Sequence, residues 1–240
     1  CDIKGSLIAV SPIRRVVSDV QIKGNIAVTE NKTARDWARL LSEYRHPCKF
    51  RSSFEIAVTI APFIGLWAVA WWVLPFSKLL AALIALMNSL FLVRLFCIQH
   101  DCGHGTLYRN KSTNDWIGRI LGIFTLTPYE LWRRSHSIHH GASGNLGKRG
   151  IGDIDTLTVT EYQNLPRWNK VKYRLYRHPI TLFVLGPAYL FFFENRLPFA
   201  YMNNPRFWLS TMSTNIAILA GISLIYYFGG VSPILFIFLP

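Results

Sequence analysis

Cysteine and acidic residues are scarce in this chain, and their scarcity excludes several classes of protein. The four cysteines, Cys1, Cys48, Cys97 and Cys102, form no CxxC pair and no disulfide framework, so a cystine-stapled secreted domain is excluded. Asp and Glu number 13 against 26 Lys and Arg, which gives a formal net charge of +13. Such a charge can indicate nucleic-acid binding, but no basic helix or base-stacking motif stands apart from the apolar segments. We therefore expect no nucleic-acid partner.

Other familiar patterns are also absent. The mixed, polar first stretch is not a signal peptide, so insertion into a membrane would depend on the first internal apolar helix. A stretch that resembles a phosphate-binding loop fails, because Lys148 is followed by Arg149 rather than by Ser or Thr. No haem-binding, cytochrome-like segment is present.

Long apolar runs make up much of what is present, and 51% of the residues are hydrophobic. About 20 residues in a helix cross the hydrocarbon core of a bilayer. Runs of that length predict spans at 56–74, 79–98 and 209–228, and a further run at 233–240 predicts a span that is cut short. Residues 180–193 are too few to cross, so we expect an interfacial or re-entrant segment there.

The basic residues predict the orientation of these spans. Residues 1–51 form a basic leader, expected to contain a helix over 33–41 with Thr33 as its N-cap, whereas the tip of the first hairpin carries only Lys78. Because Lys and Arg accumulate on the cytosolic side of a membrane, we expect the leader and the region after Ile98 to be cytosolic. The basic residues of the leader are Arg14, Arg15, Lys23, Arg35, Arg39, Arg45, Lys49 and Arg51.

These features predict the fold class. We expect an all-α polytopic membrane protein with two transmembrane helical hairpins, a cytosolic cap and interfacial helices, with residues 1–51 as leader and 52–240 as the main domain. Residues 116–126 are short and amphipathic enough to lie along the interface. The chain starts without Met and stops inside an apolar run, so we expect it to be a fragment.

Five of the seven histidines fall into two tight groups that frame the expected cap. His100 and His104 form a His-x-x-x-His pattern just after the second span, and His136, His139 and His140 form a His-x-x-His-His pattern. Spacings of three and four residues place side chains on one face of a helix. Lone histidines are more often ordinary surface or core residues, and we interpret His46 and His178 in that way. Clustered imidazoles need a cation to satisfy their nitrogens, so we expect both groups to bind metal at the cytosolic face.

Imidazole alone does not identify the metal, because it suits zinc, copper, iron and nickel. Here the two patterns resemble the histidine boxes of the membrane fatty acid desaturases. The flanking text, Leu-Val-Arg-Leu-Phe before the first box and residues 150–159 after the second, is similar to the bacterial acyl-lipid, omega-6 or delta-12-like branch. The resemblance covers nearly everything after residue 33. The family's third histidine box is missing here, so we do not expect the chain as it stands to be catalytically active.

The resemblance implies an oxidoreductase that inserts a double bond into an acyl chain. It implies two iron ions held by the box histidines, O₂ as co-substrate, an acyl lipid as substrate, and an electron donor such as ferredoxin or a cytochrome b5-like protein. It also implies an integral multi-pass protein, in the inner or plasma membrane if bacterial. Carboxylates often orient metal-bound histidines, and Asp101, Asp153 and Asp155 are candidates for that role.

Two alternative functions remain open from the sequence. A related di-iron hydroxylase or ketolase of a lipid or carotenoid would use the same boxes. A histidine-rich metal-binding membrane protein or transporter without redox chemistry is an alternative of another class. Transport predicts ionisable residues within the membrane, whereas the expected spans hold almost none apart from Arg94.

Overall fold

The computed structural model describes residues 33, 36, 37, 42, 47–150 and 154–240, and the chain divides into two units, Cys1–Arg45 and His46–Pro240. In the first unit, the Thr33 hydroxyl and backbone N–H both donate to the Asp36 carboxylate, at 2.7 and 2.8 Å. The Asp36 N–H in turn donates to the Thr33 hydroxyl at 3.4 Å. This confirms Thr33 as a helix N-cap, although most of the helix expected over 33–41 lies outside the described residues.

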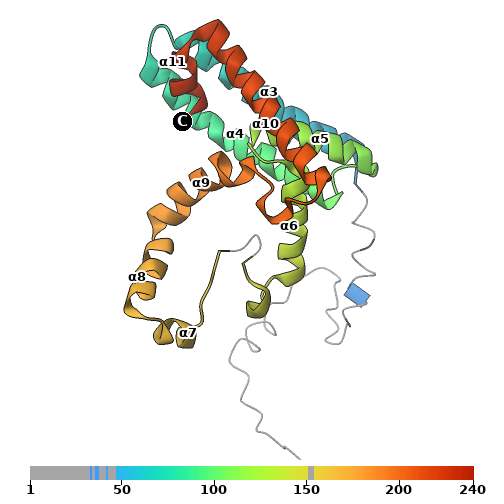
Figure 1. Cartoon of the computed structure of the whole chain (residues 1–240). Helices are drawn as coiled ribbons and strands as arrows, with labels where there is room; N and C mark the ends of the chain where they lie inside the picture. Colours follow the sequence, from blue (N-terminus) through green and yellow to red (C-terminus); the bar gives the residue numbers. More distant parts are fainter. Residues whose placement is uncertain (1–32, 34–35, 38–41, 43–46, 151–153) are drawn as a thin grey trace, which may run out of the picture. The chain divides into compact units, whose positions relative to one another are not determined.

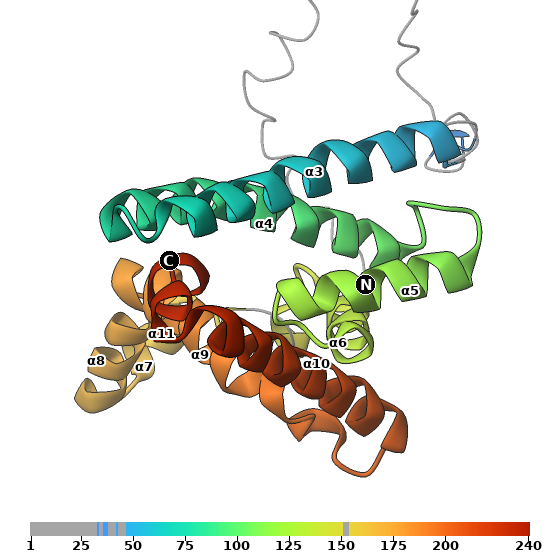
Figure 2. The same cartoon turned by 90° about the horizontal axis from the view of Figure 1, so that it is seen from above.

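The second unit begins with a helical hairpin, α3 (Lys49–Val73) and α4 (Lys78–His104), which lie side by side (Figures 1 and 2). Small residues let the two helices approach closely near the turn, where Ala70, Ala81 and Ala85 are buried. Farther along, the buried Asn88 side chain donates to the Phe63 carbonyl at 3.1 Å. The hairpin expected from the apolar runs is therefore present, and both of its helices are longer than those runs.

Helix α4 passes straight through the first histidine group. The expected span ended at Ile98, but the helix continues to His104 and stops only at Gly105, which has a φ of 71° in the left-handed region. Nothing between these positions breaks a helix, and glycine adopts a left-handed C-cap without strain. His100 and His104 therefore stand on a rigid extension of a long apolar helix.

Two shorter helices follow, α5 (Lys111–Phe124) and α6 (Tyr129–Ala142). Asn110 caps α5 by accepting from the N–H groups of Ser112 and Thr113. The large apolar side chains Trp116, Ile120 and Phe124 recur every fourth residue of α5 and are exposed, as expected for the amphipathic segment over 116–126. Helix α6 carries the second histidine group and packs against α5 and α10.

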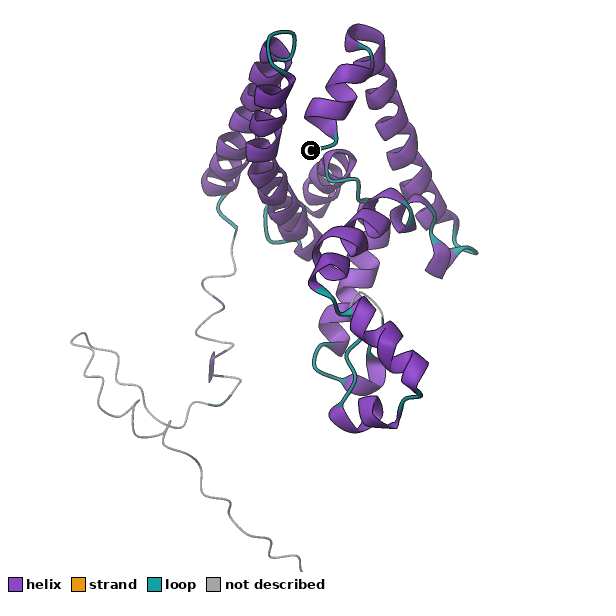
Figure 3. Cartoon of the chain, turned by 90° about the vertical axis from the view of Figure 1, so that its left-hand side faces the viewer, coloured by secondary structure: helices purple, strands orange, loops and turns teal. Residues whose placement is uncertain are grey.

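The remainder of the unit is also helical, and no strand occurs in the described part of the chain (Figure 3). Its elements are η2 (Leu146–Lys148), α7 (Val159–Asn164), α8 (Arg167–Tyr176), η3 (Thr181–Leu185), α9 (Gly186–Phe192), η4 (Glu194–Arg196), η5 (Phe199–Tyr201), α10 (Pro205–Gly229), α11 (Val231–Pro233) and η6 (Ile234–Phe238). The all-α fold class is confirmed.

Three described helices are long and apolar enough to cross a membrane, namely α3, α4 and α10. Within segment 180–193, η3 runs without a break into α9, and the continuous helix over 179–192 is shorter than the roughly 20 residues needed to cross. Beyond α10 the chain turns back at Gly230, and Ile237 of η6 packs into the small-residue cluster of the α3–α4 hairpin.

Candidate metal centre

Four histidines from the two groups converge in the structure: His100 and His104 of α4, and His136 and His140 of α6. A ligand nitrogen from each lies within 4.8 Å of the other three. The Nε2 atom of His136 lies 3.1 Å from Nε2 of His104 and 3.0 Å from Nε2 of His140. Two residues with a spacing of four on each helix therefore present their rings to one shared point, as their spacing predicted.

Close packing between α4 and α6 sets this convergence. A Cβ atom on Gly103 would lie 2.7 Å from the ring of Trp132, so only glycine fits at that position. The Trp132 ring stacks on His136 with centroids 4.7 Å apart and planes 15° apart. It also makes a T-shaped contact with the ring of Phe96, with centroids 5.5 Å apart. The Gly103–Trp132 contact thus fixes the position of α6 relative to the end of α4.

The electrostatics of the cluster favour neutral imidazoles. Burial, and then the proximity of the other histidines, lowers the pKa of His136 to about 4. A neutral imidazole offers a lone pair, whereas an imidazolium offers none. Four imidazole nitrogens within 4.8 Å of one another are a donor set that a borderline transition metal satisfies, so these residues fit a metal ion.

The other predicted site residues are not among the four converging histidines. His139 is not among the four converging residues, and its ring centroid lies 5.6 Å from that of His140 and 6.1 Å from that of His136. The Asp101 carboxylate lies 3.6 Å from Nδ1 of His100, which is too far for a strong hydrogen bond. The backbone N–H of Asp155 donates to the Tyr176 hydroxyl at 3.0 Å. Asp153 lies outside the described residues.

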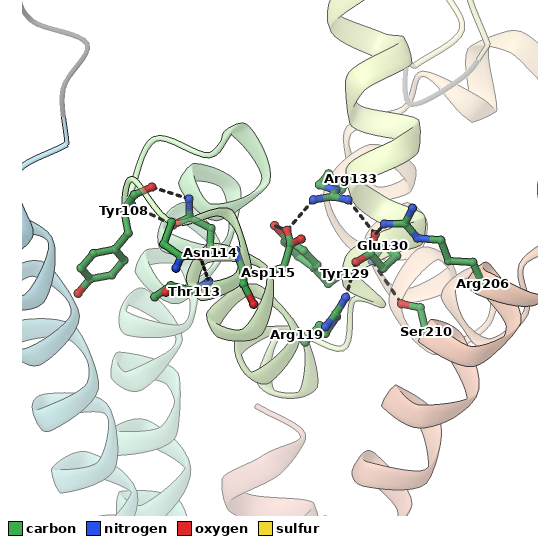
Figure 4. Close-up of polar contacts among 12 residues, drawn as sticks. Tyr108, Thr113, Asn114, Asp115, Arg119, Tyr129, Glu130, Arg133, Arg206 and Ser210 are labelled. Carbon is green, nitrogen blue, oxygen red and sulfur yellow. Dashed lines mark hydrogen bonds and ion pairs between the residues drawn. The ribbon is translucent and has the colours of Figure 1, made fainter.

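A polar network that the sequence did not reveal surrounds the start of α6 (Figure 4). Glu130 is bonded to three guanidinium groups, from Arg119, Arg133 and Arg206. Burial alone would raise the pKa of Glu130, but hydrogen bonds and charge from these arginines hold that pKa below its ordinary value. The Arg133 side chain is only 22% exposed and also pairs with Asp115.

A second set of contacts holds the loop between α5 and α6. The Thr125 hydroxyl donates at 2.5 Å to the buried Gln99, which directly precedes His100. Leu126 has a φ of 54°, unusual for a residue other than glycine, and its carbonyl accepts from Arg196. This loop therefore joins the end of α4 to the beginning of α6, and no spacing pattern in the sequence marks it.

Comparison with known proteins identifies the family to which this arrangement belongs. The family model described as "Fatty acid desaturase" matches residues 70–240. The chain belongs to the fatty acid desaturase family. The match covers α4, α10 and all four converging histidines, but only the end of α3. The resemblance noted in the sequence is therefore confirmed.

Individual desaturases show the same similarity. The chain is 39% identical to the "Fatty acid desaturase" of Bacillus subtilis over 196 residues, which are 80% of this chain and 55% of that protein. It is 37% identical over 98 residues to the "sn-1 acyl-lipid omega-3 desaturase (ferredoxin)" of Synechocystis, covering 39% of this chain and 26% of the relative. It is 30% identical over 118 residues to the "sn-1 oleoyl-lipid 12-desaturase" of Arthrospira platensis, covering 48% and 30%.

The chain thus spans about half the length of its Bacillus relative and less of the others. No solved structure matches it.

Proposed function

We propose that this chain forms the membrane hairpin and the first two ligand sets of a fatty acid desaturase that inserts a double bond into the acyl chain of a lipid. The observation that carries the proposal is the convergence of four imidazoles from α4 and α6 at the end of a helix apolar enough to cross a membrane. Membership of the desaturase family supports it.

The proposed metal is a pair of iron ions, held by His100, His104, His136, His139 and His140 together with ligands from elsewhere in the whole protein. Bound iron supplies reductive activation of O₂ and thereby the oxidant that removes hydrogen from an unactivated methylene, chemistry that side chains cannot perform. The chain's own residues hold the histidines together, orient their rings, and place the site beside apolar helices that bind the acyl chain and exclude water.

Several side chains have supporting roles in this proposal. Stacking of Trp132 on His136 fixes the orientation of that ring. Asp101, whose carboxylate lies 3.6 Å from Nδ1 of His100, would orient that ring if the distance shortened to a hydrogen bond in the metal-bound protein. Asp153 and Asp155 are retained as candidates for the same role toward the second histidine group.

The topology that we propose follows the distribution of charge. The basic leader, residues 1–51, and the histidine groups lie in the cytosol, and residues 52–240 form the desaturase domain, with spans that correspond to α3, α4, α10 and the segment that begins at 233. If the protein is bacterial, it lies in the inner or plasma membrane. Residues 180–193 would lie in the interface or re-enter the membrane. The names of two relatives include ferredoxin, which supports a separate ferredoxin-like donor, with a cytochrome b5-like protein as the alternative.

Lipid analysis tests the proposed activity. The full-length gene, expressed in a host with a simple fatty acid profile, should produce a new unsaturated fatty acid. The variant His136→Ala should not, whereas His178→Ala, which changes an exposed histidine outside both groups, should retain the activity. A product that was only hydroxylated would contradict desaturation and favour the related hydroxylases.

Metal analysis of the same purified protein tests the cofactor. The proposal expects about two iron ions per chain, a number that comes from the family's chemistry. Zinc at one ion per chain, without iron, would contradict the oxygen chemistry and favour a protein that only binds or transports metal.

A further inference from the structure

Glu130 lies in the first turn of α6, six residues before His136, and its side chain is only 5% exposed. One carboxylate oxygen accepts from Arg119 of α5 at 2.8 Å. The other accepts from Arg133 of α6 at 3.0 Å and from Arg206 of α10 at 2.8 Å. A single buried carboxylate therefore joins the consecutive helices α5 and α6 to α10, which lies far along the chain, as Figure 4 shows.

The charge balance makes Glu130 difficult to replace. The cluster holds three guanidinium groups and two carboxylates, Glu130 and Asp115, of which Asp115 bonds Arg133 at 2.5 Å. Buried charges are stable only when they are paired, and removal of one partner leaves the others uncompensated. Without the Glu130 charge, three arginines would face one remaining acid, and their repulsion would push the helices apart.

Helix α10 contributes more than one contact to the start of α6. The Ser210 hydroxyl accepts from the backbone N–H of Glu130 at 3.3 Å, and Arg206 lies one turn earlier on α10. The N-cap residue of α6, Pro128, provides no side-chain hydrogen bond. A helix that lacks its own cap needs outside acceptors for its first N–H groups, and α10 provides one of them.

The distance from Glu130 to the histidines determines how far a tilt of α6 would displace them. His136 lies six residues from Glu130, which is about 9 Å along a helix. A tilt of about 10° at the first turn would therefore move the His136 ring by more than 1 Å, whereas metal ligands need to be held within about 0.5 Å. His140 lies a further turn along and would move more.

From this geometry we propose that Glu130 is a positioning residue of the metal centre, which holds α6 against α5 and α10 so that His136 and His140 meet His100 and His104. The inference rests on the proposed metal centre, but it assigns a role to a residue outside both histidine groups. It also couples the long helix α10 to the ligand geometry through Arg206 and Ser210.

The variant Glu130→Gln tests this role, because glutamine keeps the size of the side chain and removes its charge. Full-length protein, stripped of metal, is titrated with Co²⁺ and its visible absorption is recorded. Loss of an outer partner of a metal site typically weakens metal binding by 10–100-fold, so we expect an affinity at least about tenfold weaker, with an altered cobalt spectrum at full occupancy. The matched control is Glu194→Gln, which changes an exposed glutamate in η4 and should bind Co²⁺ like the parent.

A second variant protects the test against misfolding. The side chain of Arg206 is 61% exposed, so Arg206→Gln should fold and should weaken Co²⁺ binding by a smaller factor, about threefold. The double variant Glu130→Gln with Arg206→Gln removes one unpaired positive charge and should recover part of the Co²⁺ affinity that Glu130→Gln loses. Simple loss of packing would not give such a coupling.

Three results would overturn the inference. Folded Glu130→Gln with the affinity and spectrum of the parent would show that Glu130 does not position the ligands. Arg206→Gln without any effect on Co²⁺ binding would remove the link to α10. A parent protein that bound no Co²⁺ would overturn the metal centre itself, and the positioning role with it.

Discussion

The two helices that carry the histidines are held in place by different forces. Helix α4 is long and apolar, and it is fixed by buried aliphatic and small residues of the α3–α4 hairpin. Helix α6 is short and polar, with only Tyr129, Glu130 and Ala142 buried. Packing of Tyr129 and Trp132 is supplemented there by ion pairs and hydrogen bonds at the first turn. The comparison teaches that apolar packing suffices to place one half of the site, whereas the other half also depends on a charged network.

Removal of His136 should have the largest effect on this pair of helices. Its Nε2 atom lies within 3.1 Å of nitrogens from both α4 and α6, so His136→Ala removes the atom that joins the two halves. Metal content of the purified full-length protein should fall to the background level, while His178→Ala keeps the content of the parent. Full metal content in His136→Ala would show that the two halves do not share a site.

A change at the contact between the helices should have the next largest effect. In Gly103→Ala, the new Cβ would lie 2.7 Å from Trp132, and overpacking of this kind costs about 1–3 kcal/mol. Trp132 would move away from His136, so both metal affinity and thermal stability should fall.

The matched control for that change is Gly141→Ala, where a new Cβ on α6 meets nothing within 4 Å. It should be neutral or should stabilise the helix by up to about 1 kcal/mol. Differential scanning calorimetry of both variants separates the effect of the Gly103–Trp132 contact on stability from the effect of helix propensity. Equal stability of the two variants would refute the role of that contact.

Acid should reduce the stabilising effect of the Glu130 ion pairs on α6. The pKa of Glu130 is lowered in the folded protein, so its contribution to stability is present above its unfolded value of about 4.5 and is lost as the pH falls below that value. The apparent melting temperature of the parent should therefore decline as the pH falls through this range. Glu130→Gln should be less stable at neutral pH, and its melting temperature should decline less as the pH falls. Parallel plots of melting temperature against pH for the two proteins would contradict the stabilising role of the Glu130 charge.

The smallest effect is expected at Asp101. Its carboxylate is 55% exposed and lies 3.6 Å from His100, so solvent screens the contact. Asp101→Asn should lower metal affinity by about tenfold at most, at the weak end of the range for outer partners of metal ligands. A loss as large as that in His136→Ala would mean that Asp101 binds the metal directly.

The sequence predicted the half of the site that depends on regular patterns. Apolar runs of span length and histidine spacings of three and four follow directly from helix geometry, so the hairpin and the convergence of the two groups could be expected. The extension of α4 to His104 was missed, because a polar sequence such as His-Asp-Cys-Gly-His resembles a loop until Gly105 is recognised as the cap. Glu130 and Gln99 were also missed, because their partners lie on other helices and no local spacing identifies them.

The most direct test of the shared centre is a structure of the full-length protein with iron bound, with anomalous scattering recorded at the iron absorption edge. This account predicts iron between α4 and α6, coordinated by at least one histidine from each helix. Iron coordinated by histidines of one helix alone, or lying away from both, would contradict it.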